Sequence, residues 1–406
     1  MSDQAKYDAI IVGAGPAGSS TAALLARQGF RVLLLDRAAF PRDKACGEYT
    51  SPETERVLKR MGVLDAVLNA GARRLPQMRV VSPAGVSFTM DYSGGEPQGP
   101  HVLATQRRVL DATLVDHARN CGAEVRERTK VVAVTMRDGK AAGVIIKGRD
   151  GSEHEEQARL IVGADGVHSV VVRSLGLSAP LRWPRNLGMV AHYKGYRGLD
   201  SWGEMHVSSQ GYAGLAPQSG DIVNVGLVIP ETYVANLPER GAVARFEGFA
   251  NSFPGVRACL EPAERVDSVR GVGPIGARVK RTSGPGYVLV GDAAGFFDPF
   301  TGEGVYKALR GAELAAQVAA DALSDDNLSA KSLARYSRLR RQEFTAKDAV
   351  CRLVQVFVGV PAGMDYVVRR LSRRAQARQV LTGVLGDLSD ARAALSPLYL
   401  WSLLRP

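Results

Sequence analysis

The chain has 406 residues, of which 45% are hydrophobic and 23% charged, and its formal net charge is +11. This composition indicates a globular protein with a large core and room for two or three domains. No apolar run approaches the roughly 18 residues that a membrane-spanning helix needs, and the N-terminus lacks the basic and apolar regions of a signal peptide. We therefore expect a cytoplasmic protein without a transmembrane span.

The cysteines and the charge exclude further classes. Cys46, Cys121, Cys259 and Cys351 stand far apart without a CxxC pair, which argues against a disulfide framework, an iron-sulfur cluster and a metal site. The arginines that give the positive charge are spread along the chain, with no nucleic-acid-binding motif and no basic run interleaved with aromatic residues. We expect neither a bound metal nor a nucleic-acid partner.

A strand, a glycine-rich turn and a helix open the chain, in the stretch YDAIIVGAGPAG and the residues that follow it. The apolar run 10–12 predicts a buried strand, and the Ala/Leu-rich segment 19–28 predicts a helix. Gly13 permits the tight turn, Gly15 lets the backbone approach a pyrophosphate, and Gly18 lets the helix pack on the strand. This order predicts a dinucleotide whose phosphates meet the positive end of the helix.

Acidic residues at three strand ends extend this prediction. Asp36 ends the second strand at about the distance, roughly 20 residues after the glycines, at which an acid binds the ribose hydroxyls of a dinucleotide. Asp165 with Gly166 and Gly291 with Asp292 follow two later strands. Because ligands bind outside the carboxyl ends of parallel strands, three such ends in one sheet predict one extended ligand.

The last strand end indicates which dinucleotide binds. Asp292 can accept hydrogen bonds from the sugar-alcohol chain of a flavin, and a long helix is expected from about Gly304. The N-terminus of that helix, residues 301–304, carries about half a positive charge and would stabilise the anion of a reduced flavin. These features favour FAD over NAD.

The remaining segments predict further domains. Residues 75–92 read as two strands about a turn, and residues 183–229 alternate in polarity as strands do. We expect an α/β chain, α+β overall, with three parts: a discontinuous Rossmann-like FAD-binding domain (1–74, 101–180 and 270–335), an inserted antiparallel β-sheet substrate domain (75–100 and 181–269) and a helical C-terminal region (336–406).

Four motifs together resemble one family. GAGPAG, RxxLD over Arg107–Asp111, GADGVHSVVVR over 163–173 and GDAAGFFDPFTGEG over 291–304 occur in the order found in FAD-dependent oxidoreductases. Within the flavin-monooxygenase-like superfamily the chain is similar to the geranylgeranyl reductase and menaquinone reductase group, over about residues 5–325.

The resemblance implies where the cofactor binds. Arg107 and the Asp165 loop would lie near the pyrophosphate, and residues 302–305 would face the flavin ring. The full set of implied FAD-binding residues is Gly13, Gly15, Pro16, Ala17, Gly18, Asp36, Arg37, Gly47, Arg107, Val131, Asp165, Gly166, Gly291, Asp292, Pro299, Gly302, Gly304 and Val305.

The loop after the second strand, 44–48, fits the reductase group's pattern of a basic residue followed by Cys and Gly. In that group the Cys sits beside the flavin ring, where a thiol can position or protonate an olefin during hydride transfer. The resemblance therefore makes Cys46 and Lys44 the candidate catalytic residues. The alternative is that Cys46 is a small, inert side chain, as most free cysteines are.

Two departures from the superfamily concern the substrate. Where the aromatic motif GWxWxIP or YxWxFP is often found, this chain has GYAGLAP, in which Tyr212 keeps one ring, Gly214 replaces the second and Pro217 remains. These three residues are the candidate substrate contacts. A reshaped pocket counts against a flavin halogenase, and GDAAG in place of GDAAH counts against the aromatic hydroxylases.

A second GxGxxG, at 271–276, does not predict an NADPH site, because no amphipathic helix follows it. The electrons are therefore expected from transiently bound NAD(P)H or from an electron-carrier protein. His168 lies in a motif but is expected to be structural, and His192 and His206 are expected to line the substrate strands.

These observations predict an FAD-dependent reductase that saturates a carbon–carbon double bond of an isoprenoid or other small apolar or lipid-like substrate. One alternative is an FAD-dependent monooxygenase acting on a phenol or quinone. A second is a flavoprotein that only relays electrons to a partner.

The C-terminal residues 344–406 lie beyond the resemblance. Apolar residues recur there at helical spacing, with a break expected at 361–363. Basic helices that end in aromatic residues can lie in a membrane interface, so we expect peripheral contact with the inner face of a membrane. The alternative is that the apolar face packs on the FAD domain. The residues that suggest membrane contact are Arg369, Arg370, Arg373, Arg374, Arg378, Tyr399 and Trp401.

Overall fold

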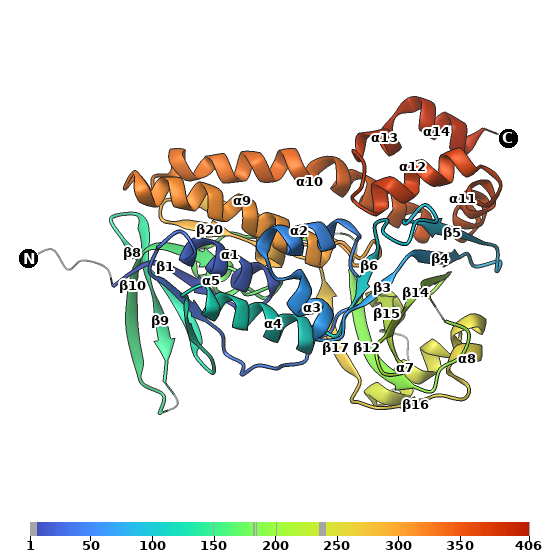
Figure 1. Ribbon diagram of the computed structural model, residues 1–406, viewed down its shortest axis with the longest axis horizontal. Coiled ribbons are helices and arrows are strands. Elements are labelled where there is room, and N and C mark those ends of the chain that lie inside the picture. The colour runs from blue at the N-terminus through green and yellow to red at the C-terminus, as the bar shows by residue number, and fades with distance from the viewer. Residues whose placement is uncertain are drawn as a thin grey trace, which may run out of the picture.

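The structure is a computed structural model that describes residues 6–148, 150–181, 183, 185–199, 201–234 and 241–405. The molecule is elongated, with one large sheet towards each end and long helices along one side (Figure 1). Helices and strands alternate through the first part of the chain, and the helices gather at its end. The mixed α/β fold with a Rossmann-like domain is thus confirmed.

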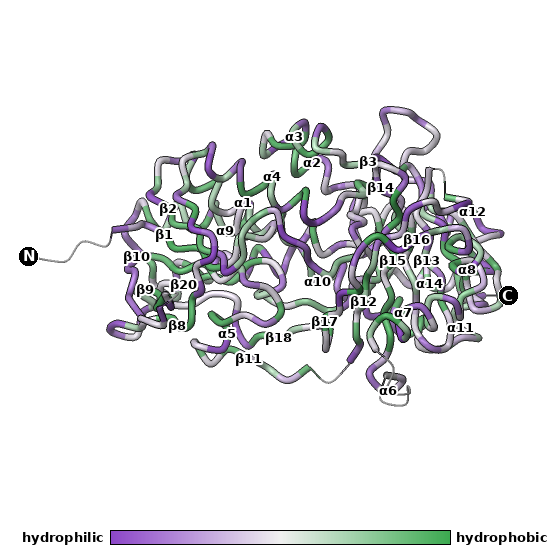
Figure 2. Tube along the Cα trace, turned by 90° about the horizontal axis from the view of Figure 1, so that it is seen from below, coloured by the Kyte–Doolittle hydropathy of each residue, from purple (hydrophilic) through white to green (hydrophobic). Residues whose placement is uncertain are grey.

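The first sheet has in spatial order the strands β19 (Ser283–Gly284), β20 (Tyr287–Leu289), β10 (Glu153–Gly163), β1 (Tyr7–Val12), β2 (Val32–Leu35) and β7 (Glu124–Arg126). The pairings from β20 to β7 are all parallel. β8 (Lys130–Arg137) and β9 (Lys140–Lys147) extend β10 as an antiparallel meander. Hydrophobic stretches follow β1, β2 and β20 (Figure 2), as expected for parallel strands covered on both faces.

Helix α1 (Pro16–Ala26) packs against this sheet and contacts both α4 (Arg107–Asn120) and α9 (Gly304–Ser324). It begins earlier than residue 19, because Pro16 occupies a first-turn position that needs no backbone donor. Its small side chains let the neighbouring helices approach closely.

The shorter elements of this part are α2 (Glu53–Met61), α3 (Leu64–Asn69), α5 (Val170–Ser174), the 3-10 helix η1 (Gly291–Ala294) and the strand pairs β3 (Arg73–Leu75) with β6 (Val102–Ala104) and β11 (Ser178–Ala179) with β18 (Arg278–Val279).

The second sheet has in spatial order β16 (Glu264–Arg265), β12 (Asn186–Lys194), β15 (Ile222–Pro230), β14 (Gly211–Gln218), β13 (Trp202–Ser208), β4 (Gln77–Val81) and β5 (Ser87–Asp91). All of these pairings are antiparallel except that of β13 with β4. β17 (Arg270–Ile275) also pairs with β12, so residues 270–275 lie in this sheet and not with the FAD-binding segments as predicted. α6 (Glu231–Val234), α7 (Ala242–Ala250) and α8 (Pro254–Leu260) belong to the same region, and α7 and α8 cover one face of the sheet.

The C-terminal helices are α10 (Ala330–Val358), α11 (Pro361–Arg373), α12 (Ala375–Leu385), α13 (Arg392–Leu395) and α14 (Pro397–Leu404). Their apolar faces pack mainly on the second sheet, where Val350, Val368 and Leu371 join Met78 and Phe88 in one core. The alternative that they pack on the FAD domain is therefore wrong for this face. The early part of α10 does pack on that domain, through Leu333 and Tyr336.

Of the five arginines that suggest membrane contact, Arg370 donates to the Tyr366 hydroxyl at 2.9 Å, and Arg374 and Arg378 bind helix ends. The Arg374 guanidinium donates to backbone carbonyls at the end of α14, and that of Arg378 donates to the carbonyls of Leu371 and Ser372 at the end of α11. Both neutralise the negative end of a helix. No described helix is by itself long and apolar enough to cross a membrane, and α10 and α11, which pass this test as a pair, are bent by 115°.

Candidate active site

Two glycines of the turn between β1 and α1, Gly13 and Gly18, cannot be replaced without a clash. Gly13 has φ +99°, and a Cβ there would lie 2.5 Å from the carbonyl oxygen of Ala164. A Cβ on Gly18 would lie 1.8 Å from the carbonyl oxygen of Gly13. Gly15, the N-cap of α1, has no side chain to cap the helix, so the first N–H groups of α1 remain open to an anion.

Two guanidinium groups converge beside this turn. Arg42 and Arg107 come within 3.7 and 3.9 Å of the position that a Cβ on Gly15 would take. Both bind the fully buried carboxylate of Asp111, Arg107 through two hydrogen bonds of 2.8 and 2.7 Å and Arg42 at 3.1 Å. Two positive charges on one carboxylate leave an excess charge that suits a pyrophosphate.

Sequence reasoning found Arg107 but not Arg42. The RxxLD motif marks Arg107, whereas Arg42 lies in an irregular loop without a motif of its own. The available signal was weak: a basic side chain shortly after the ribose-binding acid. Only the folded loop shows that Arg42 returns to the Gly15 turn.

Asp36 lies at the end of β2, where its carboxylate is fixed by the backbone. Oδ2 accepts a hydrogen bond from the N–H of Ala14, and Oδ1 accepts one from the N–H of Ala38, both at 2.8 Å. The Asp36 carbonyl accepts the N–H of Thr129, just before β8, which brings Val131 to the same end of the sheet. Arg37 is exposed beside it. This end fits an adenosine ribose.

The carboxylate of Asp165 is occupied by hydrogen bonds within its own loop. Its side chain accepts hydrogen bonds from Ser169 Oγ at 2.5 Å and from the N–H of Val170 at 2.6 Å, so it caps α5. Burial raises the pKa of this carboxyl above its usual value. Gly166, with φ +79°, leaves room for Lys44, whose Nζ would lie 3.4 Å from a Cβ there.

The third strand end meets the same cluster. Gly291 has φ +58°, and a Cβ there would approach that of Ala17 to 2.8 Å, so η1 lies directly against α1. Burial lowers the pKa of Lys44, and so does the charge of Arg107, whereas the Asp292 carboxylate acts in the opposite direction. Lys44 thus lies among the residues assigned to the cofactor, between Asp292 and Gly166.

The loop before α9 completes this side. Gly302 has φ +67°, and a Cβ there would lie 3.0 Å from the carbonyl oxygen of Tyr49. Gly304 is the first residue of α9, Val305 is buried behind it, and Pro299 precedes them. Glycine-lined turns, open helix N-termini and the Arg42, Arg107 and Lys44 charges are the groups that an FAD molecule requires, so the described residues fit this cofactor.

The loop 44–48 lies where the FAD-binding residues meet the second sheet. Cys46 is half-buried; its sulfur accepts a hydrogen bond from the N–H of Glu48 at 3.3 Å, and its carbonyl accepts one from Asn224 Nδ2 at 2.9 Å. A Cβ on Gly226 would lie 3.7 Å from the Cα of Gly47. β15 therefore supports the loop from below.

An apolar cavity of about 70 Å³ opens between the second sheet and the C-terminal helices. One end of the cavity is closed by Tyr49, from the loop that follows Cys46, and by Phe300 and Thr301, from the loop before α9. Side chains of β4, β5, β13, α10, α11 and α12 line the rest, among them Met78, Val80, Phe88, Met90, Met205, Val354, Phe357, Met364, Val368 and Leu385.

None of the three predicted substrate residues lines this cavity, but two of them contact residues that do. Tyr212 is buried; its hydroxyl donates to Asp298 at 2.6 Å and its ring meets that of Phe300 edge to face at 4.9 Å. A Cβ on Gly214 would lie 3.5 Å from the methyl of Met205, a cavity residue. Pro217 is buried in β14 and does not line the cavity.

Asp298 is a buried acid that sequence reasoning missed. It accepts hydrogen bonds from Tyr212 Oη, Gln355 Nε2 and Asn186 Nδ2, which come from β14, α10 and β12. Burial raises its pKa to about 6, although these donors oppose the shift. Asp298 therefore joins the second sheet and α10 to the loop before α9.

The histidines of the second sheet lie within hydrogen-bonding distance of carboxylates. His192 Nε2 lies 2.7 Å from Glu48 Oε2, and its Nδ1 lies 2.7 Å from Asp267 Oδ2. His206 Nε2 lies 2.8 Å from Glu204 Oε2. His168 is exposed. Among the described residues, no group of three or more His, Cys, Asp or Glu side chains is placed to hold a metal ion.

Comparison with known proteins agrees with this geometry. A family model described as the FAD binding domain matches residues 6–192. The chain is 30% identical over 358 residues to the digeranylgeranylglycerophospholipid reductase of Methanosarcina acetivorans, a match that covers 86% of this chain and 83% of the relative. It is 28% identical over 405 residues to the menaquinone reductase of Mycolicibacterium smegmatis, covering 94% and 92%.

Solved structures show the same fold. A geranylgeranyl bacteriochlorophyll reductase-like protein from Thermoplasma acidophilum superposes with a TM-score of 0.81 at 22% identity, over 98% of this chain and 96% of the other. A myxobacterial chondrochloren halogenase, described as FAD-dependent, superposes with a TM-score of 0.77 at 25% identity, over 83% and 80%.

Fold, site and comparisons define an FAD-dependent oxidoreductase. More narrowly, the chain belongs to the geranylgeranyl reductase family, as the order of its motifs suggested.

Proposed function

We propose that this protein reduces a carbon–carbon double bond of an isoprenoid or similarly apolar lipid. The observation that carries the proposal is the apolar cavity, which begins at the loop before α9 and at Tyr49 and runs beneath the C-terminal helices. Met78, Met90 and Met205 line it. Because methionine side chains are flexible and polarizable, a narrow cavity can widen around a chain-like ligand.

The chain's own residues divide the work between binding and proton supply. Arg42, Arg107 and Lys44 would hold the phosphates of FAD, and Asp36 the adenosine ribose. Bound FAD supplies a hydride to one carbon of the double bond. We assign the proton for the second carbon to the Cys46 thiol, which would then regain a proton from solvent.

The electron donor is part of the same proposal. The 271–276 glycines lie in and just after β17, a strand of the second sheet, and no helix follows them. They do not form a second dinucleotide turn. We therefore propose that NAD(P)H or a protein donor delivers electrons at the FAD site itself.

An anaerobic assay tests the reaction. FAD-loaded protein is reduced chemically without oxygen and mixed with a polyprenyl lipid, and the saturated product is measured. The proposal requires product without oxygen, because a reductase needs only a hydride and a proton. Product formed only in air would instead support the monooxygenase, and no lipid product in either case would support electron relay.

Variants of two cysteines connect this assay to the site. Cys46→Ser should retain FAD but slow the step that follows flavin reduction, because a hydroxyl is a much weaker acid than a thiol. Cys121→Ser is the matched control, since Cys121 is also half-buried but lies at the far end of α4. Equal turnover in both variants would make Cys46 a packing residue.

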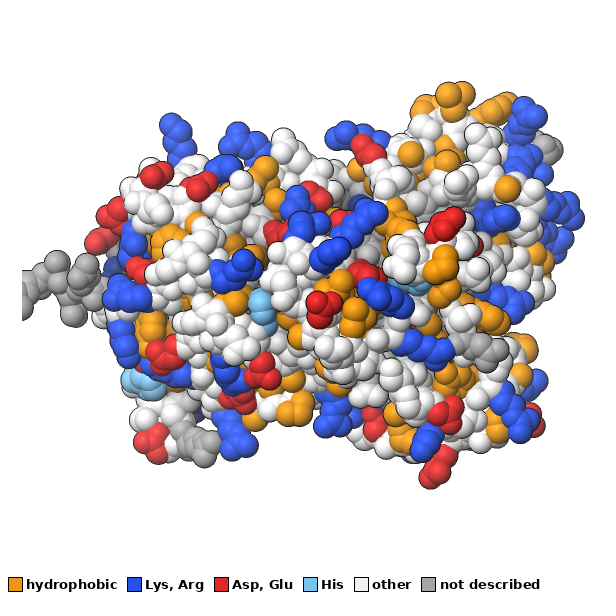
Figure 3. Space-filling view, in the orientation of Figure 1, with side chains coloured by type: hydrophobic (Ala, Val, Ile, Leu, Met, Phe, Trp, Pro, Cys, Tyr) orange, Lys and Arg blue, Asp and Glu red, His pale blue; other side chains and the backbone are white. Residues whose placement is uncertain are grey.

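We also propose that the protein contacts the inner face of a membrane through α14. Leu398 and Trp401 are 83% and 67% exposed there. Figure 3 shows hydrophobic side chains at the upper right of the molecule, over the C-terminal helices, with Lys and Arg side chains beside them. An apolar tip flanked by positive charges suits an anionic lipid surface, from which an apolar substrate would be drawn.

A further inference from the structure

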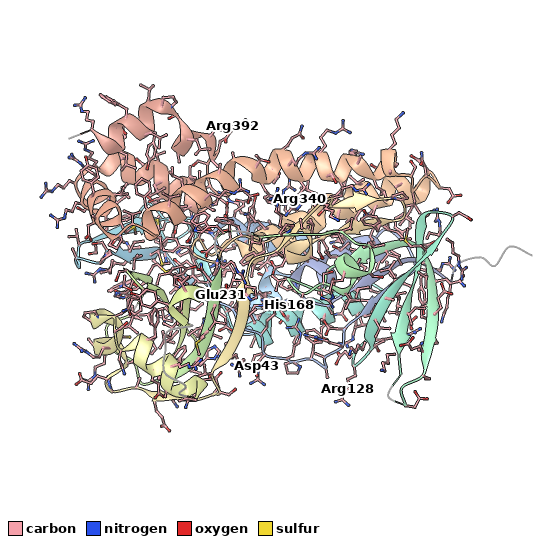
Figure 4. All side chains as sticks on the ribbon, turned by 180° about the vertical axis from the view of Figure 1, so that it is seen from behind. Asp43, Arg128, His168, Glu231, Arg340 and Arg392 are labelled. Carbon is pink, nitrogen blue, oxygen red and sulfur yellow. The ribbon has the colours of Figure 1, made fainter. Side chains whose placement is uncertain are left out.

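The loop from Asp43 to Glu48, which carries Cys46, is tied to the second sheet at both of its ends. At one end the Arg270 guanidinium lies 3.0 Å from the Asp43 carboxylate. At the other end His192 Nε2 lies 2.7 Å from Glu48 Oε2. Figure 4 shows Asp43 at the edge where the FAD-binding part meets the second sheet. Strands β12 and β17 therefore hold both ends of the loop.

Asp267 joins these two contacts into one chain of ion pairs. Its Oδ2 lies 2.7 Å from His192 Nδ1 and 2.7 Å from the Arg270 guanidinium. Its Oδ1 accepts the backbone N–H of His192 at 3.0 Å. The contacts run from Asp43 through Arg270, Asp267 and His192 to Glu48. Hydrogen bonds between ionised groups are the stronger class, so this chain fixes the loop firmly.

Glu48 transmits this hold to Cys46. Its Oε1 accepts the backbone N–H of Arg107 at 2.7 Å, and its own N–H donates to the Cys46 sulfur at 3.3 Å. Its φ is +53°, a left-handed conformation that a residue with a side chain keeps only where its surroundings hold it. A weaker hold on the Glu48 carboxylate will therefore move the N–H that fixes the sulfur.

We propose that His192 is a positioning residue which, by joining Glu48 to Asp267, sets the position of the Cys46 thiol from the substrate domain. The catalytic role of Cys46 rests on the proposed function, whereas the position of its sulfur can be measured without turnover. Carboxylate oxygens only accept hydrogen bonds, so the imidazole can bond both acids only while both ring nitrogens carry protons. Loss of one proton releases one acid and loosens the loop.

The groups around the His192 imidazole determine the pH at which it loses this proton. Burial lowers the pKa of His192, but hydrogen bonds and charge from Glu48 and Asp267 outweigh it and raise the pKa to about 8. The neighbour opposite His192 on β15 is the neutral Asn224. The other charged side chains on the elements packed against the ring are Asp43 and Lys44 on the loop, Lys194 on β12, Glu264 and Arg265 on β16, and Arg270 on β17.

Alkylation of Cys46 tests the proposal. FAD-loaded wild type, His192→Gln and His206→Gln are treated with iodoacetamide from about pH 6 to about pH 9.5, and modification of Cys46 is measured by peptide mass spectrometry relative to Cys121. Cys121 serves as the reference for reagent and exposure time, and comparison of the variants at the same pH removes the effect of pH on the two thiols. His206 is the matched control, because it is buried on β13 of the same sheet and pairs with Glu204 instead of the loop.

In the wild type, the Cys46-to-Cys121 ratio should rise about tenfold as the pH passes 8, the change that loss of one charge-assisted hydrogen bond permits. His192→Gln should show the high ratio at every pH, so its plot of ratio against pH should lack the bend near pH 8. His206→Gln should give the same plot as the wild type. In Asp267→Asn a neutral ring can donate from Nε2 to Glu48 and accept at Nδ1 from the amide, so the rise near pH 8 should be lost.

Equal ratios in wild type and His192→Gln at every pH, including no modification of Cys46 in either, would overturn the proposal. Should His192→Gln fail to retain FAD, a rise near pH 8 that persists in Asp267→Asn would overturn it equally. If Cys46 alkylation changes as expected but the protein reduces no polyprenyl lipid, His192 positions the thiol and the proposed function is wrong. If the protein reduces the lipid but Cys46 alkylation does not depend on His192, the proposed function stands and the positioning role is wrong.

Discussion

Asp111 shows how a buried charge selects the side chains that can serve a ligand. Its carboxylate is fully buried, and such a group is stable only when it is paired. Arg107 satisfies it with two hydrogen bonds, which leaves Arg42 as the guanidinium with capacity to spare. Arg107 therefore both pairs with Asp111 and faces the Gly15 turn, whereas Arg42 is the guanidinium that can be replaced without leaving Asp111 unpaired.

This division predicts the effect of Arg42→Gln. The variant should fold, because Asp111 keeps both bonds to Arg107, but it should bind FAD about 10- to 100-fold more weakly, since a charge-assisted hydrogen bond contributes roughly 1.5–3 kcal/mol. Recovery of flavin fluorescence on dilution measures the affinity. Arg108→Gln, which removes the charge of an exposed arginine next to Arg107 on α4, is the control. An unchanged affinity would remove Arg42 from the cofactor site.

The raised pKa of His192 predicts a change of stability with pH. The folded-state pKa of about 8 lies above the unfolded value of 6.5, so the stabilisation is fully present below pH 6.5 and is lost as the pH rises through 8. The shift corresponds to about 2 kcal/mol. In chemical denaturation, the difference in unfolding free energy between wild type and His192→Gln should shrink by about that amount from about pH 6 to about pH 9. A constant difference would contradict the charged state of the ring.

At the scale of elements, the sequence predicted both the structure and the packing of the first elements, but for the C-terminal helices it did not predict the packing partner. Turn, helix and ribose acid between Gly13 and Asp36 interact locally, so glycine spacing and periodicity define them. The C-terminal helices were also found from periodicity. Their partner was not, because the apolar face of α11 meets β4 and β5, which lie far away in the sequence.

The same limit applies to side chains in the site. His192 and Glu48 are separated by 144 residues, and their contact depends on how β12 reaches the loop. Arg374 and Arg378 read as a basic surface, but they cap helix ends whose position only packing determines. Sequence identified the residue types at the site, whereas long-range packing decided their partners.

Strand β14 offers a test of the cavity. The Cβ of Gly214→Ala would make an ordinary contact of 3.5 Å with the methyl of Met205, so this variant should resemble the wild type. Gly214→Phe should displace Met205 into the cavity. We expect it to keep FAD but to lose most turnover of a long polyprenyl lipid, with less effect on a short one. A chain-length series of substrates measures this; equal losses at all lengths would mean that the cavity does not hold the chain.

For the whole molecule, the position of the C-terminal helices changes how membrane contact must be tested. Truncation after about residue 343 would remove the second half of α10 and all of α11 to α14, and would uncover the apolar face of β4 and β5, where Met78 and Phe88 are buried. Exposure of such a face promotes aggregation. Loss of lipid association in a truncated protein would therefore not identify the membrane-binding residues, and substitutions at exposed positions are needed.

Leu398 and Trp401 are suited to this purpose, because both are largely exposed and their replacement leaves the core intact. We expect the wild type to sediment with anionic liposomes at low salt and to be released as the ionic strength rises, since each nearby Lys or Arg contributes about 1 kcal/mol that salt screens. The double variant Leu398→Gln with Trp401→Gln should stay in the supernatant under the same conditions. Met136→Gln replaces an exposed apolar side chain on β8, at the opposite end of the molecule (Figure 1), and should sediment like the wild type. If wild type and double variant both remain in solution while binding FAD normally, α14 only covers the second domain and an apolar substrate must reach the cavity by another route.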